Sequence, residues 1–196
     1  MSDKWESFAL LLIDVQRDFW TDEMRAAFPD YDVKVSNLLV SCRGAGIDVI
    51  HLRAMFRKDQ SDWMARYRLT GNIPCIEGTP GAAVFPFAEA ADAEKVIVKQ
   101  TFDGFLNPEL ADHLEATGKR FLFIAGLVTS VCVLLTAASA AQRGYLVTVV
   151  DDCCADLPSA HAHTLDRYPF IFSRTVSDKL VAGRDEWQGM LDGLNG

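Results

Sequence analysis

The chain has 196 residues and a formal net charge of -8 at pH 7, and 49% of its residues are hydrophobic. That apolar content is enough for a core of this size, so we expect one domain spanning residues 1–196. The negative charge disfavours binding to phosphate backbones and to anionic lipid. Nucleic acid and membranes are therefore not expected as partners.

The N-terminal stretch MSDKWE is polar, and the apolar run FALLLI that follows it is interrupted at Asp14. This pattern indicates neither a signal peptide nor a membrane span, so we expect a cytoplasmic location. The five cysteines are odd in number and lack the spacing of a disulfide framework. Reduced thiols are therefore expected at Cys42, Cys75, Cys132, Cys153 and Cys154.

Short apolar runs alternate with helix-like segments along the chain. The runs predict strands at 8–13, 47–52, 96–98, 121–125, 145–150 and 171–176. Helices are predicted at 32–43, at 107–116 with Asn107 as cap, at 131–142, and at 159–167 with Ser159 as cap. The segment 131–142 is apolar on nearly every face, which indicates a buried helix. The order predicts an α/β fold: a three-layer α/β/α sandwich with a mostly parallel, doubly wound sheet of about six strands.

Three chemically active side chains follow predicted strands. Asp14 ends the first strand, Lys99 ends the third, and Cys132 follows the turn GLVTS after the fourth. In a parallel sheet these positions share the carboxyl edge, where ligands bind. A thiol in the first turn of a helix lies near backbone N–H groups and the positive end of the helix dipole, and a nearby lysine also favours thiolate. We therefore expect a nucleophilic cysteine.

The blocks LLIDVQRDF, VIVKQTFDGF and GLVTSVCVLLTAASAAQRGYLVTVVDDCCAD resemble the isochorismatase-like cysteine hydrolases, over about residues 8 to 180. That group includes nicotinamidases, N-carbamoylsarcosine amidase and ureidoacrylate amidohydrolases. The resemblance implies that Asp14 is the general base, Lys99 the triad lysine and Cys132 the nucleophile of an acyl-enzyme. It also implies a cis peptide between Leu127 and Val128, with the backbone N–H groups of Val128 and Cys132 as the oxyanion hole.

The resemblance implies a cofactor-free hydrolase that cleaves a C–N bond in a small amide, carbamoyl or ureido compound, in a homo-oligomer, either a dimer or a tetramer. Nicotinamidases carry a metal motif after the second strand, but this chain has His51 alone there, so no metal is expected. Two alternatives stay open: vinyl-ether hydrolysis of the isochorismatase type, and a non-catalytic binding or assembly role for the fold.

Side chains near the predicted strand ends are candidates for binding substrate. They are Gln16, Phe19, Trp20, Arg53, Phe102, Phe105 and Thr129, although core packing explains the aromatic ones equally well. The segment 53–68 is basic, so Arg53 or Arg57 is a candidate for binding an anionic end of the substrate, with a surface or interface loop as the alternative. The acids of DDCCAD are expected to cap backbone amides, and His161 and His163 to lie on the surface.

Overall fold

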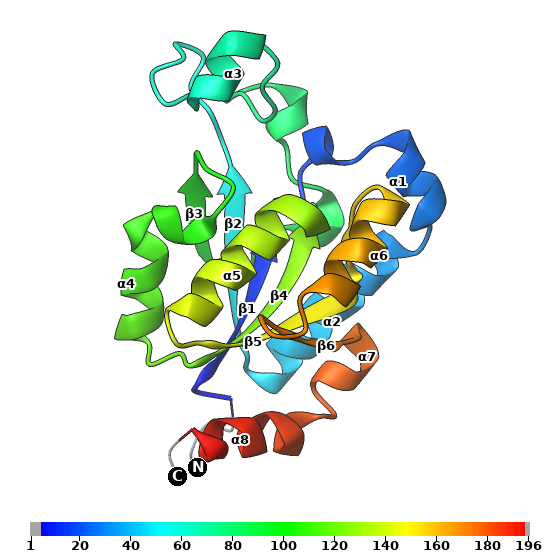
Figure 1. The fold of residues 1–196 in the computed structure, drawn as a ribbon, viewed down its shortest axis with the longest axis vertical. Coiled ribbons are helices and arrows are strands. Elements are labelled where there is room, and N and C mark those ends of the chain that lie inside the picture. The colour runs from blue at the N-terminus through cyan, green and yellow to red at the C-terminus, as the bar shows by residue number, and fades with distance from the viewer. Residues whose placement is uncertain (1–4, 195–196) are drawn as a thin grey trace.

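The computed structural model describes residues 5–194, which form a six-stranded sheet with helices on both faces (Figure 1). All neighbouring strands pair in parallel, in the order β3-β2-β1-β4-β5-β6. The strands are β1 (Phe8–Ile13), β2 (Asp48–Ala54), β3 (Lys95–Lys99), β4 (Phe121–Leu127), β5 (Leu146–Ala155) and β6 (Ser173–Thr175). The predicted three-layer α/β fold is confirmed.

The connections between strands contain helices of very different lengths. The α-helices are α1 (Asp22–Ala27), α2 (Tyr31–Ala45), α3 (Ala65–Thr70), α4 (Pro108–Ala116), α5 (Leu134–Gln142), α6 (Pro158–Arg167), α7 (Ser177–Leu180) and α8 (Arg184–Gly193). Short 3₁₀ turns are η1 (Arg17–Phe19), η2 (Pro80–Ala82), η3 (Pro86–Ala88) and η4 (Gly104–Leu106). The element η5 (Thr129–Val133) is a single π-helical turn between β4 and α5.

Each face of the sheet has its own apolar core, because successive strand residues point to opposite faces. On β1, Phe8, Leu10 and Leu12 pack against the face covered by α2 and α8, and Ala9, Leu11 and Ile13 pack against the face covered by α4 and α5. All six residues of β1 are buried. This central strand therefore fixes the positions of both layers.

Two expectations about helices are wrong in detail. Asn107 caps α4 as predicted, since its side chain accepts a hydrogen bond from the Glu109 N–H. Helix α6, however, begins at Pro158 after Leu157, so Ser159 lies inside it and is not its cap. The segment 131–142 is not buried on all sides, because the Leu135 side chain is 41% exposed. The small alanines on one face of this helix allow it to pack closely on the sheet, while the opposite face remains open to solvent.

The connection from β2 to β3 carries α3 beyond the carboxyl ends of these strands (Figure 1). Helix α3 has no buried residue of its own. A small separate cluster, formed by Ala54, Phe56, Cys75 and Ala82, joins this segment to the end of β2, with Tyr67 packed against it. The segment 55–82 therefore folds over the edge of the sheet where ligands are expected.

In the part of the chain that the structure describes, no helix is both long and apolar enough to span a bilayer.

A tight contact between β1 and β4 generates a stability prediction. Gly126 has a φ of +127°, and a Cβ there would overlap the carbonyl oxygen of Ile13 on the neighbouring strand. Gly126→Ala should therefore lower the free energy of unfolding by about 3 kcal/mol or more, measured by urea denaturation. Gly118→Ala is the matched control, because Gly118 also has a positive φ but meets no atom within 4 Å. Its cost should be about 1 kcal/mol, and equal losses in the two variants would contradict the contact argument.

Candidate active site

The three residues at the strand ends meet in one buried cluster. The Lys99 Nζ lies 2.6 Å from the Asp14 Oδ2 and 3.7 Å from the Cys132 Sγ. The three side chains are almost completely buried, with 0%, 1% and 4% of Asp14, Lys99 and Cys132 exposed. Because β1 lies between β2 and β4, the cluster forms where the strand order reverses, the usual binding point in such sheets.

The backbone at Asp14 turns sharply to place its carboxylate. Asp14 has a φ of +51°, a left-handed conformation that few residues other than glycine adopt. Its N–H still donates to the Leu52 carbonyl at 2.8 Å, and its Oδ1 accepts from the Ala54 N–H at 2.9 Å. The carboxylate is thus held by the end of β2 on one side and by Lys99 on the other.

Burial and ion pairing act in opposite directions on this pair. Burial raises the pKa of Asp14, and this outweighs the Lys99 ammonium, which lowers it. Burial lowers the pKa of Lys99, but the negative charge of Asp14 overcomes this and leaves that pKa above its ordinary value. The Lys99 Nζ also donates to the Thr101 carbonyl at 2.9 Å. The result is a cation fixed in place next to a carboxylate that accepts a proton more readily than usual.

The electrostatics of Cys132 differ from the sequence-based expectation of a thiolate. Burial raises the pKa of the Cys132 thiol well above its ordinary value, and the Asp14 carboxylate adds to this, whereas Lys99 opposes it. Burial therefore disfavours ionisation of the Cys132 thiol beside the Asp14–Lys99 ion pair. The Lys99 Nζ contacts both the Asp14 carboxylate and the Cys132 sulfur, so it brings a proton acceptor next to the thiol.

The turn that carries the thiol is wider than an α-helical turn. The Leu127–Val128 peptide bond is cis, and the Val128 carbonyl accepts from the N–H groups of Val131 and Val133. Thr129 and Ser130 do not project freely: the Thr129 Oγ1 lies 2.8 Å from the His161 Nδ1, and Ser130 is bound to Asp156. Thr129 is fully buried, so its side chain anchors the turn.

Gln16 lies beside the cluster but uses its amide on the protein itself. Its Nε2 donates to the carbonyls of Ala54 and Ala82 at 2.8 and 2.9 Å, and its Oε1 accepts from the Ala54 N–H at 2.9 Å. The side chain is completely buried. Gln16 therefore ties β1, β2 and η2 together, which differs from the predicted contact with substrate.

The four aromatic candidates separate into different regions. Phe19 is partly buried against the small apolar cluster formed by Ala54, Phe56, Cys75 and Ala82. Phe102 is 38% exposed and makes an edge contact with the Tyr67 ring. Trp20 stacks on Tyr31 at 4.7 Å and lines a separate pocket of about 260 Å³. Phe105 is buried against Tyr145 and under the Arg143 guanidinium. Packing therefore accounts for Trp20 and Phe105, whereas Phe19 and Phe102 lie next to the covering segment.

The basic segment does not bring Arg53 to the cluster. The Arg53 Nη2 pairs with the Glu89 Oε2 at 3.3 Å, on the side of β2 that faces η3. Arg57 lies in the covering segment, where its backbone N–H donates to Asp62. Among the described residues 5–194, the ion pairs include Arg53 but not Arg57, so Arg57 is the better remaining candidate for an anionic substrate end.

His51, the lone histidine of β2, is part of a structural network. Its Nε2 lies 2.9 Å from the Glu94 Oε2, and Arg43 binds both oxygens of Glu94. Arg43 and the Ala91 N–H help to lower the pKa of Glu94 to about 2, against the effect of its burial. Within residues 5–194, no group of three or more His, Cys, Asp or Glu side chains is arranged to hold a metal ion.

One residue next to the cluster, Tyr67, was not expected from the sequence. Tyr67 of α3 packs on Phe56 with ring centroids 5.5 Å apart, and burial raises the pKa of Tyr67. Asp156 holds the nucleophile turn through Ser130 and accepts from the Leu157 N–H, which confirms the expected bonding of the DDCCAD acids to backbone amides at this residue. His161, expected on the surface, is half-buried. No local pattern marks Tyr67, because its position depends on how segment 55–82 folds.

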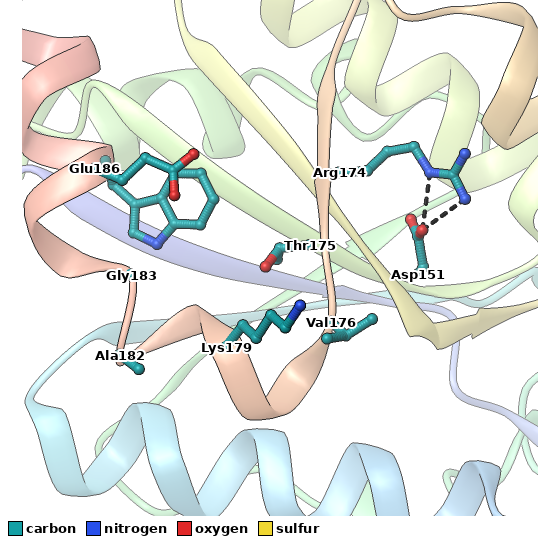
Figure 2. A pocket seen from close by; sticks show the side chains of 9 residues that line it. Asp151, Arg174, Thr175, Val176, Lys179, Ala182, Gly183 and Glu186 are labelled. Atoms are coloured by element: carbon teal, nitrogen blue, oxygen red, sulfur yellow. Dashed lines mark hydrogen bonds and ion pairs between the residues drawn. The ribbon is translucent and has the colours of Figure 1, made fainter.

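The large pocket in Figure 2 lies away from this chemistry. It has a volume of about 710 Å³ and lies between β6 and the helices α7 and α8. Figure 2 shows Arg174 turned to Asp151, to which its guanidinium is bound at 2.7 and 2.8 Å. None of Asp14, Lys99 and Cys132 lines this pocket. Its arginine is already paired, and the pocket contains none of the three residues at the strand ends, so the buried cluster remains the candidate active site.

A family model described as "Isochorismatase domain" matches residues 8–190. The chain belongs to the isochorismatase family. This match contains all three residues of the cluster, and members of the isochorismatase family are hydrolases that include amidases.

Known members of the isochorismatase family resemble this chain over most of its length. The isochorismatase family protein YddQ of Bacillus subtilis is 27% identical, over 79% of this chain and 86% of that protein. Maleamate amidohydrolase of Pseudomonas putida is 28% identical, over 76% of this chain and 72% of that enzyme. The crystal structure of an isochorismatase family protein from Desulfovibrio vulgaris superposes with a TM-score of 0.79 at 28% identity, over 89% of this chain and 96% of that one.

The electrostatics of this isochorismatase-family site predict opposite effects of two substitutions on the thiol. Asp14→Asn removes the anion that raises the pKa of Cys132, so alkylation of Cys132 by iodoacetamide at pH 7 should become about tenfold faster. Lys99→Met removes the opposing cation and should slow the same reaction. Peptide mapping by mass spectrometry separates Cys132 from the other four thiols. If Asp14→Asn slows alkylation, Asp14 activates the resting thiol and the electrostatic description is wrong.

Proposed function

We propose that the protein is a cysteine-dependent hydrolase that cleaves a C–N bond in a small amide, carbamoyl or ureido compound. The observation that carries this proposal is the buried cluster, in which Lys99 contacts both the Asp14 carboxylate and the Cys132 thiol. It contains a nucleophile, a proton acceptor and a fixed cation, which covalent acyl transfer requires. Maleamate amidohydrolase, a relative of this chain, is named for an amide substrate.

In the proposed first half-reaction, the Cys132 Sγ attacks the carbonyl carbon of the amide while its proton passes to Asp14. The carbonyl oxygen becomes an oxyanion, which the backbone N–H groups of Val128 and Cys132 stabilise. As the C–N bond breaks, Asp14 returns the proton to the leaving nitrogen, and ammonia or an amine departs. The raised pKa of Asp14 suits this role, because a base is most effective when its pKa approaches the working pH.

In the second half-reaction, water attacks the thioester carbonyl and Asp14 accepts its proton. The tetrahedral intermediate then expels the Cys132 sulfur, which takes the proton back, and a carboxylic acid or carbamate leaves. Lys99 remains positively charged throughout and balances the negative charge that moves between Asp14, the sulfur and the oxyanion. Burial strengthens each of these interactions, because little water is present to screen them.

The thiol favours this reaction over vinyl-ether hydrolysis. An acid–base hydrolysis of a vinyl ether needs Asp14 but has no step for a sulfur nucleophile. Cys132 is almost fully buried and is fixed by the ion pair rather than placed at a surface. Acyl transfer gives this buried thiol a role as nucleophile, whereas vinyl-ether hydrolysis gives it none.

Ammonia release from a panel of small amides and ureides tests the proposal. The panel should include maleamate, N-carbamoyl amino acids and nicotinamide, with ammonia measured by a coupled glutamate dehydrogenase assay. Cys132→Ala should lower kcat/KM by about 10³-fold or more on any active compound, because no acyl-enzyme forms. Cys153→Ala is the matched control, because this thiol is also buried but lies in the core on the other face of the sheet.

Two results would contradict the proposal. One is turnover in Cys132→Ala equal to that of the wild type, which would instead favour an acid–base hydrolysis that depends on Asp14. The other is the absence of a covalent acyl adduct on Cys132, by mass spectrometry, in a sample quenched during turnover of an active amide.

A further inference from the structure

Asp156 lies directly after β5, next to the turn that carries the thiol. The register of the sheet pairs Leu127 of β4 with Ala155 of β5, so Asp156 is level with Val128. Its Oδ2 accepts from the Ser130 N–H at 2.8 Å and from the Ser130 Oγ at 2.6 Å. Its Oδ1 accepts from the Leu157 N–H at 2.7 Å. Both carboxylate oxygens are therefore used to fix backbone.

This carboxylate is buried without a cation. Only 6% of Asp156 is exposed, and the ion pairs found within residues 5–194 do not include it. Removing a charge from water is costly unless strong hydrogen bonds compensate for it. Here the compensation comes from two N–H groups and one hydroxyl, and two of these three donors belong to Ser130. Most of the hydrogen bonds of this carboxylate therefore hold the turn before Cys132 in place.

A second contact holds the same turn from α6. The His161 Nδ1 lies 2.8 Å from the Thr129 Oγ1, and the imidazole packs edge-on against the Phe28 ring with centroids 4.9 Å apart. Thr129 and Ser130 are adjacent, so the turn is tied to Asp156 and to α6 at consecutive residues. These ties lie between the two N–H groups proposed for the oxyanion hole, at Val128 and Cys132.

We propose that Asp156 is a positioning residue of the active site: by holding the Ser130 N–H and hydroxyl, it fixes the orientation of the backbone amides that receive the oxyanion. This inference rests on the proposed function. Asp156 does not contact the reacting atoms in this arrangement, and it acts through Ser130. Its effect is therefore specific to reactions that form an oxyanion on a carbonyl.

Two chemical probes of Cys132 separate this role from general loosening of the fold. Acylation by p-nitrophenyl acetate forms a tetrahedral oxyanion and releases p-nitrophenolate, which is followed by absorbance. Alkylation by iodoacetamide displaces iodide at a saturated carbon and needs no oxyanion hole. In Asp156→Ala, acylation should slow by about tenfold or more, whereas alkylation should change by less than about threefold. Asp156→Asn, which keeps an acceptor oxygen, should recover part of the acylation rate.

Asp152 provides a matched control within β5, the strand that Asp156 follows. It accepts from the Ser177 N–H and from the Ser177 Oγ, each at 2.8 Å, so it makes the same pair of bonds at the start of α7. Asp152→Ala should leave both probe reactions of Cys132 unchanged. If Asp156→Ala does not fold, Ser130→Ala carries the test, because it removes only the hydroxyl bond and should still lower the ratio of acylation to alkylation.

Three results are decisive against the inference or its basis. Equal slowing of acylation and alkylation in Asp156→Ala would assign Asp156 to general structure and overturn the positioning role. Unchanged acylation in a folded Asp156→Ala protein would overturn it too. Wild-type acylation no faster than that of Cys132→Ala would instead count against the proposed function, and the positioning role would fall with it.

Discussion

The buried ion pair between Asp14 and Lys99 is the interaction on which the rest of the site depends. Two charges removed from water are tolerated only when each has close partners, and here the Ala54 N–H and the Thr101 carbonyl supplement the pair. These partners come from the ends of β2 and β3, so the sheet must be correctly registered before the pair is stable. The thiol of Cys132 then meets a carboxylate and a cation whose positions are already fixed.

Burial affects the proton affinity of both Asp14 and Cys132. Burial raises the pKa of both groups, so it makes the Asp14 carboxylate a better proton acceptor and disfavours ionisation of the Cys132 thiol. A thiol that is protonated at rest is also less open to oxidation than a free thiolate.

Much of the fold could be predicted because its signals are local. Continuous apolar runs mark β1 and β4, and Asn107 followed by Pro108 marks the start of α4. The shared edge of Asp14, Lys99 and Cys132 followed from their places at the carboxyl ends of predicted parallel strands. What could not be predicted depended on tertiary contacts: Gln16 and Arg53 find partners far along the chain, and Tyr67 reaches the site only through the fold of segment 55–82. The direction of the pKa shift of Cys132 could not be predicted either, because desolvation depends on the completed core.

The wide separation of the three residues along the chain has a consequence for folding. Lys99 lies 85 residues from Asp14 and 33 from Cys132, and each follows a different strand. Folding slows as contacts join more distant parts of a chain, and parallel strands require such contacts. No short fragment contains the cluster, and an intermediate that lacks one central strand would lack the chemistry as well. Recovery of hydrolysis during refolding would therefore report the assembly of the central strands, later than spectroscopic signals that follow helix formation.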